Sequence, residues 1–502
     1  MGGVTLDGKG LTLEHLGAVA RRGEKVRLDA ATLERIGRSR RGIEARVAAG
    51  EAIYGVNTGF GRLADVQVPA GSLARLQLNL LRSHACGVGE PFAEDVVRAM
   101  LLLRANVLAG GYAGVRPAVL EKLAELLNAG VHPVVPSQGS VGASGDLAPL
   151  AHLALPLVGE GEAWVGGERL AGAEALSRAG VTALELAPKE GLALINGTQA
   201  MTAVAALALL DAERLVAAAD TVAAMSVDAL QGTDTAFLGE IHQARPHPGQ
   251  VASARNLWDL MQGSEIRAAH DTCSRVQDAY SLRCSPQVHG TARDALRHLR
   301  ATLEVEINAA TDNPMVLPDG RVVSGGNFHG APVAAACDFA AIALTSAASI
   351  SERRAARLVT PEHSGLPPFL VEASGLNSGF MMAHVTAAAL VSECKTLSHP
   401  ASVDTIPTSA GREDHVSMGT WAARKLARVV ANLRSVLAVE FLEAAQGIEM
   451  RRPLRSSAPL ERAVLVVRRR VPALDADRFL HDDIVAAAAL LEEVTPERLL
   501  AG

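Results

Sequence analysis

Residues 199–230 read QAMTAVAALALLDAERLVAAADTVAAMSVDAL, an almost unbroken run of strong helix formers without glycine or proline. The run is far longer than an average helix, and apolar side chains occur on nearly every face of it. A helix of this kind has to be covered on all sides by neighbouring helices or by other subunits. The segment therefore predicts a bundle of long helices, and it favours an oligomer.

Four later segments are also rich in helix formers and well above the average length of a helix, namely 292–310, 331–357, 381–397 and 415–447. Glycine and proline are instead concentrated in the first two fifths of the chain, where 163–170 is the plausible hairpin, with two glycines near its middle. We expect a mainly α protein with a mixed N-terminal region over 1–198 and an extended helical bundle over 199–502, which together form one functional unit.

The composition limits the classes of function. The chain has 502 residues, roughly three domain-equivalents at about 150 residues each, and 49% of them are hydrophobic. Its 48 Lys and Arg residues are outnumbered by 54 Asp and Glu residues, which gives a net charge of -6. A globular fold with a large core is predicted, and no nucleic acid partner is expected, since there is no basic surface for a polyanion.

The five cysteines contain no C-x-x-C pair and are odd in number, which predicts a reducing compartment and no metal site. The first residues lack the basic start and apolar core of a signal peptide, and Leu6 breaks the myristoylation pattern. The most apolar stretch, 331–350, consists mostly of small residues and carries Asp338, so it fits a helix buried in protein. We expect a cytoplasmic protein that does not enter a membrane.

The most unusual stretch is a Gly/Ser-rich loop that leads into a helix, SQGSVGASGDLAPLAH at 137–152. Asp146 is a credible N-cap, with Pro149 in the first turn. A structural loop or a phosphate cradle is the ordinary explanation, but no Gly-Lys-Ser/Thr follows, and Asp146 would repel an anion. A serine-hydrolase elbow around Ser144 also fails, because the last position of that frame is Asp146 instead of glycine.

A further interpretation is that Ala143, Ser144 and Gly145 cyclise. The amide nitrogen of Gly145 would attack the carbonyl of Ala143, and loss of two waters would leave a 4-methylidene-imidazol-5-one (MIO) ring. Glycine permits the tight backbone, serine supplies the leaving hydroxyl, and alanine is small enough for closure. The tripeptide alone is weak evidence, because a second copy occurs at 373–375.

Nine motifs in order give that interpretation its weight: 54–61 (YGVNTGFG), 83–90 (SHACGVGE), 142–152 (GASGDLAPLAH), 196–199 (NGTQ), 276–284 (VQDAYSLRC), 311–314 (TDNP), 324–329 (SGGNFH), 377–380 (NSGF) and 413–418 (EDHVSM). With them, nearly the whole chain resembles the aromatic amino acid ammonia-lyases. The resemblance implies a fumarase/aspartase-like helical architecture. It also implies a homotetramer with active sites shared between subunits, and elimination of ammonia from an amino acid.

Elimination of ammonia needs an electrophile, which unmodified side chains do not provide. Pyridoxal phosphate would need a Schiff-base lysine, and the six lysines lie outside every motif, so we expect no pyridoxal phosphate. The resemblance implies that the ring from Ala143, Ser144 and Gly145 is the electrophile and that Tyr54 is the base. It also implies that Asn196 hydrogen-bonds at the electrophile and the substrate, and that Phe328 packs near the ring. By themselves, Tyr54 and Phe328 would be read as packing residues and Asn196 as an N-cap.

The resemblance further implies that Arg283 binds the substrate carboxylate, with Tyr280 and Gln277 beside it. Their mutual spacing of three places all of them near one face of a helix. Arg283 can form two parallel hydrogen bonds with a carboxylate, although a surface salt bridge is the ordinary alternative.

Substrate choice depends on His84 and Glu413, because a carboxylate gives an imidazole N–H a partner. We expect conversion of L-histidine to trans-urocanate and ammonia. Family members specific for tyrosine also carry histidine in the 83–90 segment, so a tyrosine ammonia-lyase or aminomutase stays an alternative. Gly411-Arg412 replaces the usual Asn-Gln, and Arg412 could compete for Glu413. A non-catalytic helical scaffold is the remaining alternative.

Overall fold

The structure is a computed structural model that describes residues 3–59, 65–270 and 276–501. Phe60 and Gly61 of the first motif and Cys273 lie outside the described residues. The chain divides into two compact units. The first unit comprises Met1–Leu207, Arg300–Cys337 and Pro400–Arg424, and the second comprises Ala208–Leu299, Asp338–His399 and Lys425–Gly502. The boundary expected from the sequence, with an N-terminal region over 1–198 and a helical bundle over 199–502, stays a prediction.

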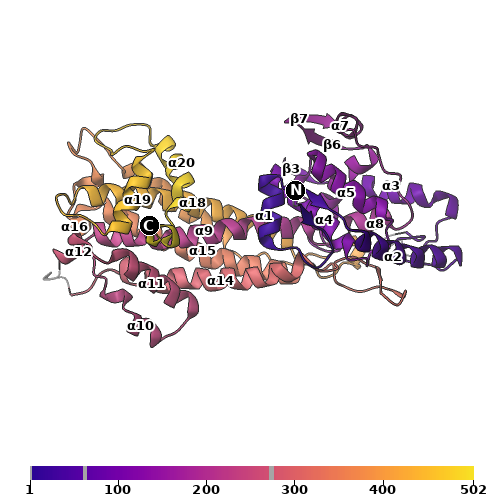
Figure 1. The fold of residues 1–502 in the computed structure, drawn as a ribbon, viewed down its shortest axis with the longest axis horizontal. Helices are drawn as coiled ribbons and strands as arrows, with labels where there is room; N and C mark the ends of the chain where they lie inside the picture. Colours follow the sequence, from indigo (N-terminus) through magenta and orange to yellow (C-terminus); the bar gives the residue numbers. More distant parts are fainter. Residues whose placement is uncertain (1–2, 60–64, 271–275, 502) are drawn as a thin grey trace. The chain divides into compact units, whose positions relative to one another are not determined.

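The first unit consists mainly of helices of moderate length around an apolar core. They are α1 (Leu13–Arg22), α2 (Ala30–Ala48), α3 (Leu73–His84), α4 (Glu94–Ala109), α5 (Pro117–Ala129), α6 (Leu147–Ala154), α7 (Gly172–Ala179) and α8 (Glu190–Ile195). Helix α4 is buried from Val97 to its end at Ala109, with α1 and α5 packed against it. It is therefore the central helix of this unit (Figure 1).

Small sheets join the helices of the first unit. The pairs are parallel β1 (Val4–Thr5) with β2 (Val26–Arg27), and antiparallel β3 (Val88–Pro91) with β5 (Pro136–Gln138) and β8 (Met315–Val316) with β9 (Val322–Val323). A three-stranded antiparallel sheet has the order β4 (Val131–Pro133), β6 (Glu162–Val165), β7 (Glu168–Ala171). The predicted hairpin is the β6–β7 pair, and Gly166 and Gly167 have the positive φ values of 59° and 86° that its two-residue turn requires.

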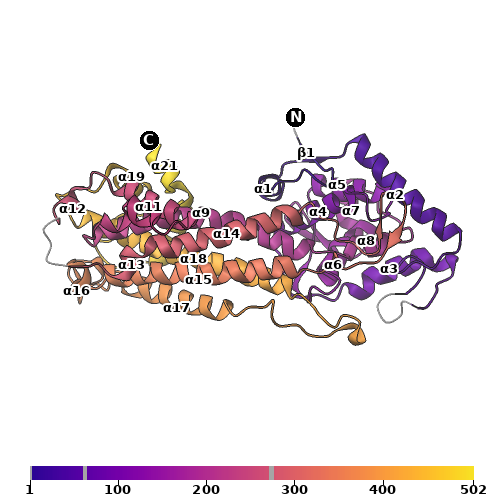
Figure 2. The same ribbon diagram turned by 90° about the horizontal axis from the view of Figure 1, so that it is seen from below.

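The predicted long helices are confirmed, with small shifts at their ends. They are α9 (Gln199–Ala229), α14 (Ser285–Glu306), α15 (Ala331–Leu358), α17 (Met381–Leu397) and α18 (Gly419–Glu449). In the second unit, parts of these helices lie side by side (Figures 1 and 2). The shorter helices of this unit are α10 (Gly239–Gln243), α11 (Pro248–Met261), α12 (Glu265–Ala268), α13 (Tyr280–Arg283), α16 (Pro361–Ser364), α19 (Ala458–Arg468), α20 (Leu480–Leu490) and α21 (Pro496–Leu500).

Buried polar contacts fix the register of the long helices in the second unit. Glu440 of α18 accepts hydrogen bonds from Ser226 of α9 at 2.6 Å, and its two oxygens accept from Arg354 of α15 at 2.5 and 2.9 Å. Helix α15 is long and apolar enough to cross a membrane, but 72% of its most apolar window is buried inside protein. The expected mainly α fold is thus observed, with an apolar helix packed within it.

Candidate active site

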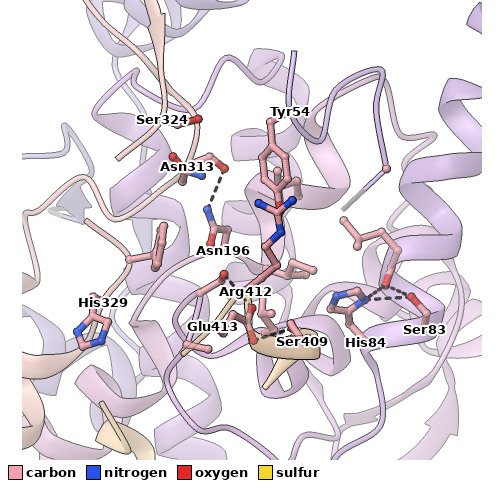
Figure 3. Close-up of a pocket in the computed structure, with 18 of the residues that line it drawn as sticks. Tyr54, Ser83, His84, Asn196, Asn313, Ser324, His329, Ser409, Arg412 and Glu413 are labelled. Carbon is pink, nitrogen blue, oxygen red and sulfur yellow. Dashed lines mark hydrogen bonds between the residues drawn. The ribbon is translucent and has the colours of Figure 1, made fainter. Parts of the chain in front are cut away.

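A cavity of about 800 Å³ lies in the first unit, and loops far apart in the sequence line it (Figure 3). Most of the predicted site residues are in its wall, namely Tyr54, His84, Ala143, Ser144, Asn196, Phe328 and Glu413. Gly145 follows Ser144 directly. Tertiary structure therefore brings residues from several of the nine motifs to one place, although the segments are separated by hundreds of residues.

The loop with the Ala143-Ser144-Gly145 sequence is tightly folded against a second turn. Gly145 has a φ of +77°, and a Cβ at this position would lie 2.1 Å from the carbonyl oxygen of Gly197. Gly145 and Gly197 form a parallel bridge, and the Asp146 N–H donates to the Gly197 carbonyl at 2.7 Å. Only glycine fits there, for reasons of both backbone conformation and space. Ala143 is buried beside it.

Asp146 has a different role from the one expected. It occupies the N-cap position of α6, but its side chain makes no capping hydrogen bond to that helix. Its carboxylate instead accepts the backbone N–H of Met201 at 2.8 Å, in the first turn of α9, and the hydroxyls of Ser140 (2.8 Å) and Thr420. Burial raises the pKa of Asp146, while these hydrogen bonds oppose the shift. The carboxylate thereby ties the Gly/Ser loop to the starts of α9 and α18.

Asn196 ends α8, so the N-cap expected from sequence alone is wrong. Its Nδ2 atom donates to Oδ1 of Asp312 at 3.1 Å. It also donates to the carbonyl oxygen of Asn313 at 3.0 Å (Figure 3). Its Oδ1 atom is buried and has no hydrogen-bond partner among the described residues. The side chain lines the cavity with one unused acceptor.

His84 is the last residue of α3, and its ring is held by local hydrogen bonds. Its Nδ1 atom lies 2.9 Å from the carbonyl oxygen of Leu80 and 3.0 Å from the hydroxyl of Ser83. Because a carbonyl only accepts, Nδ1 carries the proton and Nε2 is left as an acceptor. Burial lowers the pKa of His84, although the Leu80 hydrogen bond and the charge of Glu413 oppose this, so the ring is neutral near pH 7.

Glu413 is held in the cavity wall by two hydroxyls. Its Oε2 atom accepts from Thr408 at 2.6 Å and from Ser409 at 2.8 Å, while Oε1 lies 3.4 Å from the hydroxyl of Ser144. The competing pair considered from the sequence, Arg412 with Glu413, is not among the ion pairs of residues 3–59, 65–270 and 276–501. Arg412 also lines the cavity, and its Nη2 atom lies 3.8 Å from Oδ2 of Asp65.

Comparison with known proteins identifies the family. A family model described as aromatic amino acid lyase matches residues 11–469. The chain belongs to the aromatic amino acid lyase family. It is 56% identical over 498 residues to the histidine ammonia-lyase of Anaeromyxobacter sp. (strain K), which covers 97% of this chain and 98% of that protein. This identity confirms the resemblance that the nine motifs predicted.

Solved structures agree with this placement of the lyase. The histidine ammonia-lyase from Trypanosoma cruzi has a TM-score of 0.92 at 44% identity and covers 99% of this chain and 95% of its own. The tyrosine aminomutase from Streptomyces globisporus has a TM-score of 0.93 at 40% identity, with coverage of 100% and 98%. The fold is thus shared by enzymes named for different substrates, so substrate choice has to be argued from the cavity itself.

Besides Gly145, three predicted residues of this lyase do not line the cavity. Gln277, Tyr280 and Arg283 belong to the second unit, where Nη2 of Arg283 donates to Oε1 of Gln277 at 3.0 Å. The Arg283 guanidinium lies 4.6 Å from the centre of the Tyr280 ring, and Tyr280 is 71% exposed. The expected contact among the three is present, but helix α13 begins only at Tyr280, so Gln277 is not on it.

Sequence reasoning missed several residues that shape the cavity of the lyase. Thr408 and Ser409 hold Glu413, and Asp312 holds Asn196. Asp312 was within a recognised motif, so its proximity to the site could have been expected. Thr408 and Ser409 gave no signal, because a short polar loop of this composition is common in any protein.

The loop of this lyase fits the MIO group that the sequence predicts. Gly145 leaves no room for a side chain, Ala143 is buried, and Ser144 lies in the cavity wall. The orphaned Oδ1 atom of Asn196 is a polar group that no described residue satisfies. Among the described residues, no group of three or more His, Cys, Asp or Glu side chains is placed to hold a metal ion. The loop geometry thus suits an organic ring made from the chain.

Proposed function

We propose that this chain converts L-histidine to trans-urocanate and ammonia, as the first step of histidine degradation. The observation that carries the proposal is the pair of acceptors, the Glu413 carboxylate and Nε2 of His84, on the wall of the cavity that also contains Ser144. An imidazole N–H is the donor that such acceptors bind, whereas a phenyl ring offers none. The names of the relatives support the same substrate.

Members of the family use MIO, and we propose that it forms here autocatalytically from Ala143, Ser144 and Gly145. When present, the ring supplies an electrophile that makes the substrate amine a better leaving group. The chain's own residues bind the substrate and move protons near the ring. Tyr54 is proposed to take the β-proton of the substrate, and Phe328 packs in the same wall and helps to exclude water.

The substrate carboxylate needs a cation, and we propose Arg283 with Tyr280 and Gln277 for this role. Since these residues do not line the cavity, they are proposed to reach it from a neighbouring copy in a homotetramer. Exposed Tyr280 beside an Arg283 guanidinium is consistent with a surface that another subunit completes. We also propose a cytoplasmic location, because the thiols of Cys86, Cys284 and Cys394 are free.

The test is incubation of the purified protein with L-histidine, L-tyrosine and L-phenylalanine separately, while the ultraviolet spectra of the products are followed. Urocanate formed from L-histidine at a rate far above the other two is expected. Formation of coumarate or of a β-amino acid from tyrosine, without urocanate, would overturn the proposal in favour of a tyrosine lyase or aminomutase. No product from any of them would favour the scaffold alternative.

A further inference from the structure

Asn196 has a nearly complete set of partners. Its N–H donates to the Leu192 carbonyl at 3.0 Å, and its own carbonyl accepts from Nη1 of Arg104 at 2.9 Å. Both protons of Nδ2 go to oxygens, one on Asp312 and one on Asn313. Because both partners are acceptors only, the amide cannot be turned the other way. The remaining group, Oδ1, is buried and unpartnered among the described residues, and the side chain lines the cavity.

Asp312 connects the two ends of α8. Its Oδ1 atom accepts from Asn196 at 3.1 Å, at the C-terminal end, and also from the N–H of Asn313 at 2.8 Å. Its Oδ2 atom accepts from Nζ of Lys189 at 2.6 Å, directly before the first residue of the helix. One carboxylate oxygen therefore serves Lys189, and the other serves Asn196.

The contact with Asp312 holds Lys189 in an unfavourable environment and an unfavourable backbone conformation. Its side chain is fully buried, and its backbone has a φ of +80°, which is unusual for a residue with a Cβ. Burial lowers the pKa of Lys189, whereas the charge and hydrogen bond of Asp312 oppose that shift. A buried ion pair on a strained backbone is weak evidence for stability, since apolar residues of similar volume often do as well. The geometry of the Lys189–Asp312 pair instead suits the positioning of the Asn196 amide.

We infer that Lys189 and Asp312 are positioning residues that lock the Asn196 amide with Oδ1 toward the cavity, where it accepts a hydrogen bond from the substrate amine. This inference rests on the proposed function, because it assigns Oδ1 a donor from an amino acid. Lys189 anchors Oδ2 of Asp312, so that Oδ1 stays available to Nδ2 of Asn196. Neither Lys189 nor Asp312 lines the cavity, so both act through Asn196.

A carboxylate is required at position 312 because both of its oxygens face hydrogen-bond donors. In an Asp312→Asn variant, the introduced amide has one acceptor oxygen for three donors, namely Nζ of Lys189, Nδ2 of Asn196 and the N–H of Asn313. The buried ammonium group would be the costlier one to leave without an acceptor, so the introduced amide would give its oxygen to Lys189 and its NH₂ group to Asn196. Two NH₂ groups would then face each other, and turning the Asn196 amide would place its oxygen against the Asn313 carbonyl, so in either orientation the amide loses a hydrogen bond and Oδ1 is no longer held toward the cavity.

Two double variants separate positioning from packing. In Lys189→Met/Asp312→Asn the competing ammonium is gone, so the introduced amide at position 312 can give its oxygen to Asn196 again. In Lys189→Met/Asp312→Leu the side chain at position 312 has a similar shape but no acceptor. Both variants remove Lys189 and the Asp312 carboxylate together, and both remove the carboxylate charge that acts on the fully buried Arg104, so this cost is the same in the two and their comparison isolates the acceptor at position 312. The matched control is Asp338→Asn, since Asp338 lies 2.9 Å from Nζ of Lys425 in a similarly buried pair of the second unit.

The experiment measures kcat and KM for L-histidine, the mass of the 143–145 peptide and the thermal unfolding midpoint. We expect Asp312→Asn and Lys189→Met/Asp312→Leu to lose about 10- to 150-fold in kcat with little change in KM, while the ring still forms. Lys189→Met/Asp312→Asn should recover to within a few-fold of wild type. Asp338→Asn should shift the unfolding midpoint and leave kcat nearly unchanged.

Equal kcat values in the two double variants would overturn the inference, because acceptor and non-acceptor at position 312 would then be equivalent. Loss of the ring in Lys189→Met/Asp312→Leu would also overturn it, since the residues would act on maturation of the loop. Failure of the proposed function has a different signature. In that case the wild-type protein itself gives no urocanate from L-histidine.

Discussion

Ser144 and Glu413 lie 269 positions apart in the chain, and the hydroxyl of Ser144 is 3.4 Å from Oε1 of Glu413. The serine proposed to become the electrophile and the carboxylate proposed to select the substrate are therefore neighbours on one cavity wall. Thr408 and Ser409 hold the other carboxylate oxygen, so Oε1 is the one directed at the reacting group. Substitutions of Ser144 or Glu413 therefore test both the proposed reaction and the proposed choice of substrate.

Cyclisation is expected at Ala143-Ser144-Gly145 and not at the second copy, Ala373-Ser374-Gly375. A Cβ at Gly145 would meet the Gly197 carbonyl at 2.1 Å, whereas nothing lies within 4 Å of one at Gly375. Only the first copy is compressed by its surroundings. Peptide mass mapping of native protein should find a deficit of two waters at 143–145. Ser144→Ala should abolish both the deficit and activity, and Ser374→Ala, the control, should change neither; an unmodified 143–145 peptide would disprove the mechanism.

Tyr54→Phe is expected to keep the fold and the ring yet lose about 10² to 10⁴ in kcat, because the proposed general base would be gone while the ring volume is retained. The measurement is urocanate formation at saturating L-histidine, with the 143–145 peptide mass as a check on maturation. Tyr112→Phe is the control, since Tyr112 does not line the cavity. Near-normal turnover by Tyr54→Phe would reassign the base, and Tyr280 would be tested next.

Glu413→Gln is expected to lower turnover of L-histidine by at least about 10-fold, because a charge-assisted hydrogen bond of roughly 1.5 to 3 kcal/mol is weakened. Any trace turnover of tyrosine should hold steady or rise. The ratio of the two rates is compared with that of Arg412→Gln. This ratio should resemble wild type because Arg412, although it lines the cavity, lies 3.8 Å from Asp65 and forms no ion pair with Glu413 among the described residues. A ratio that is the same in all three proteins would favour the tyrosine-lyase alternative.

His84 should give the binding of L-histidine a dependence on pH. Burial lowers the pKa of His84, so the neutral ring persists down to pH values below its ordinary 6.5, and protonation of Nε2 then removes an acceptor. KM should rise as the pH falls through this lowered pKa. The substrate imidazole titrates in the same range, so the wild-type profile is compared with that of His84→Gln. Identical profiles would show that His84 does not bind the imidazole.

Local sequence patterns account for the helices and for the membership of the family. Unbroken runs such as 199–230 fold as helices because neither glycine nor proline interrupts them, and periodicity is a local property. The motifs also contain Tyr54, Ser144 and Glu413, which line the cavity. Substrate expectations followed from the type of side chain, a carboxylate for an imidazole N–H.

The hydrogen-bond partner of each polar group depends on how the helices and loops pack in three dimensions. Asp146 and Asn196 both look like ordinary N-caps in the sequence, yet one accepts from the start of α9 and the other ends α8 and donates to Asp312. Lys189 lies outside every motif, so no sequence pattern connects it with the site. In the structure it is buried against Asp312. These hydrogen bonds depend on distances of about 3 Å between atoms that the chain separates by 55 to 123 residues. Such distances are set by packing, which local sequence patterns do not encode.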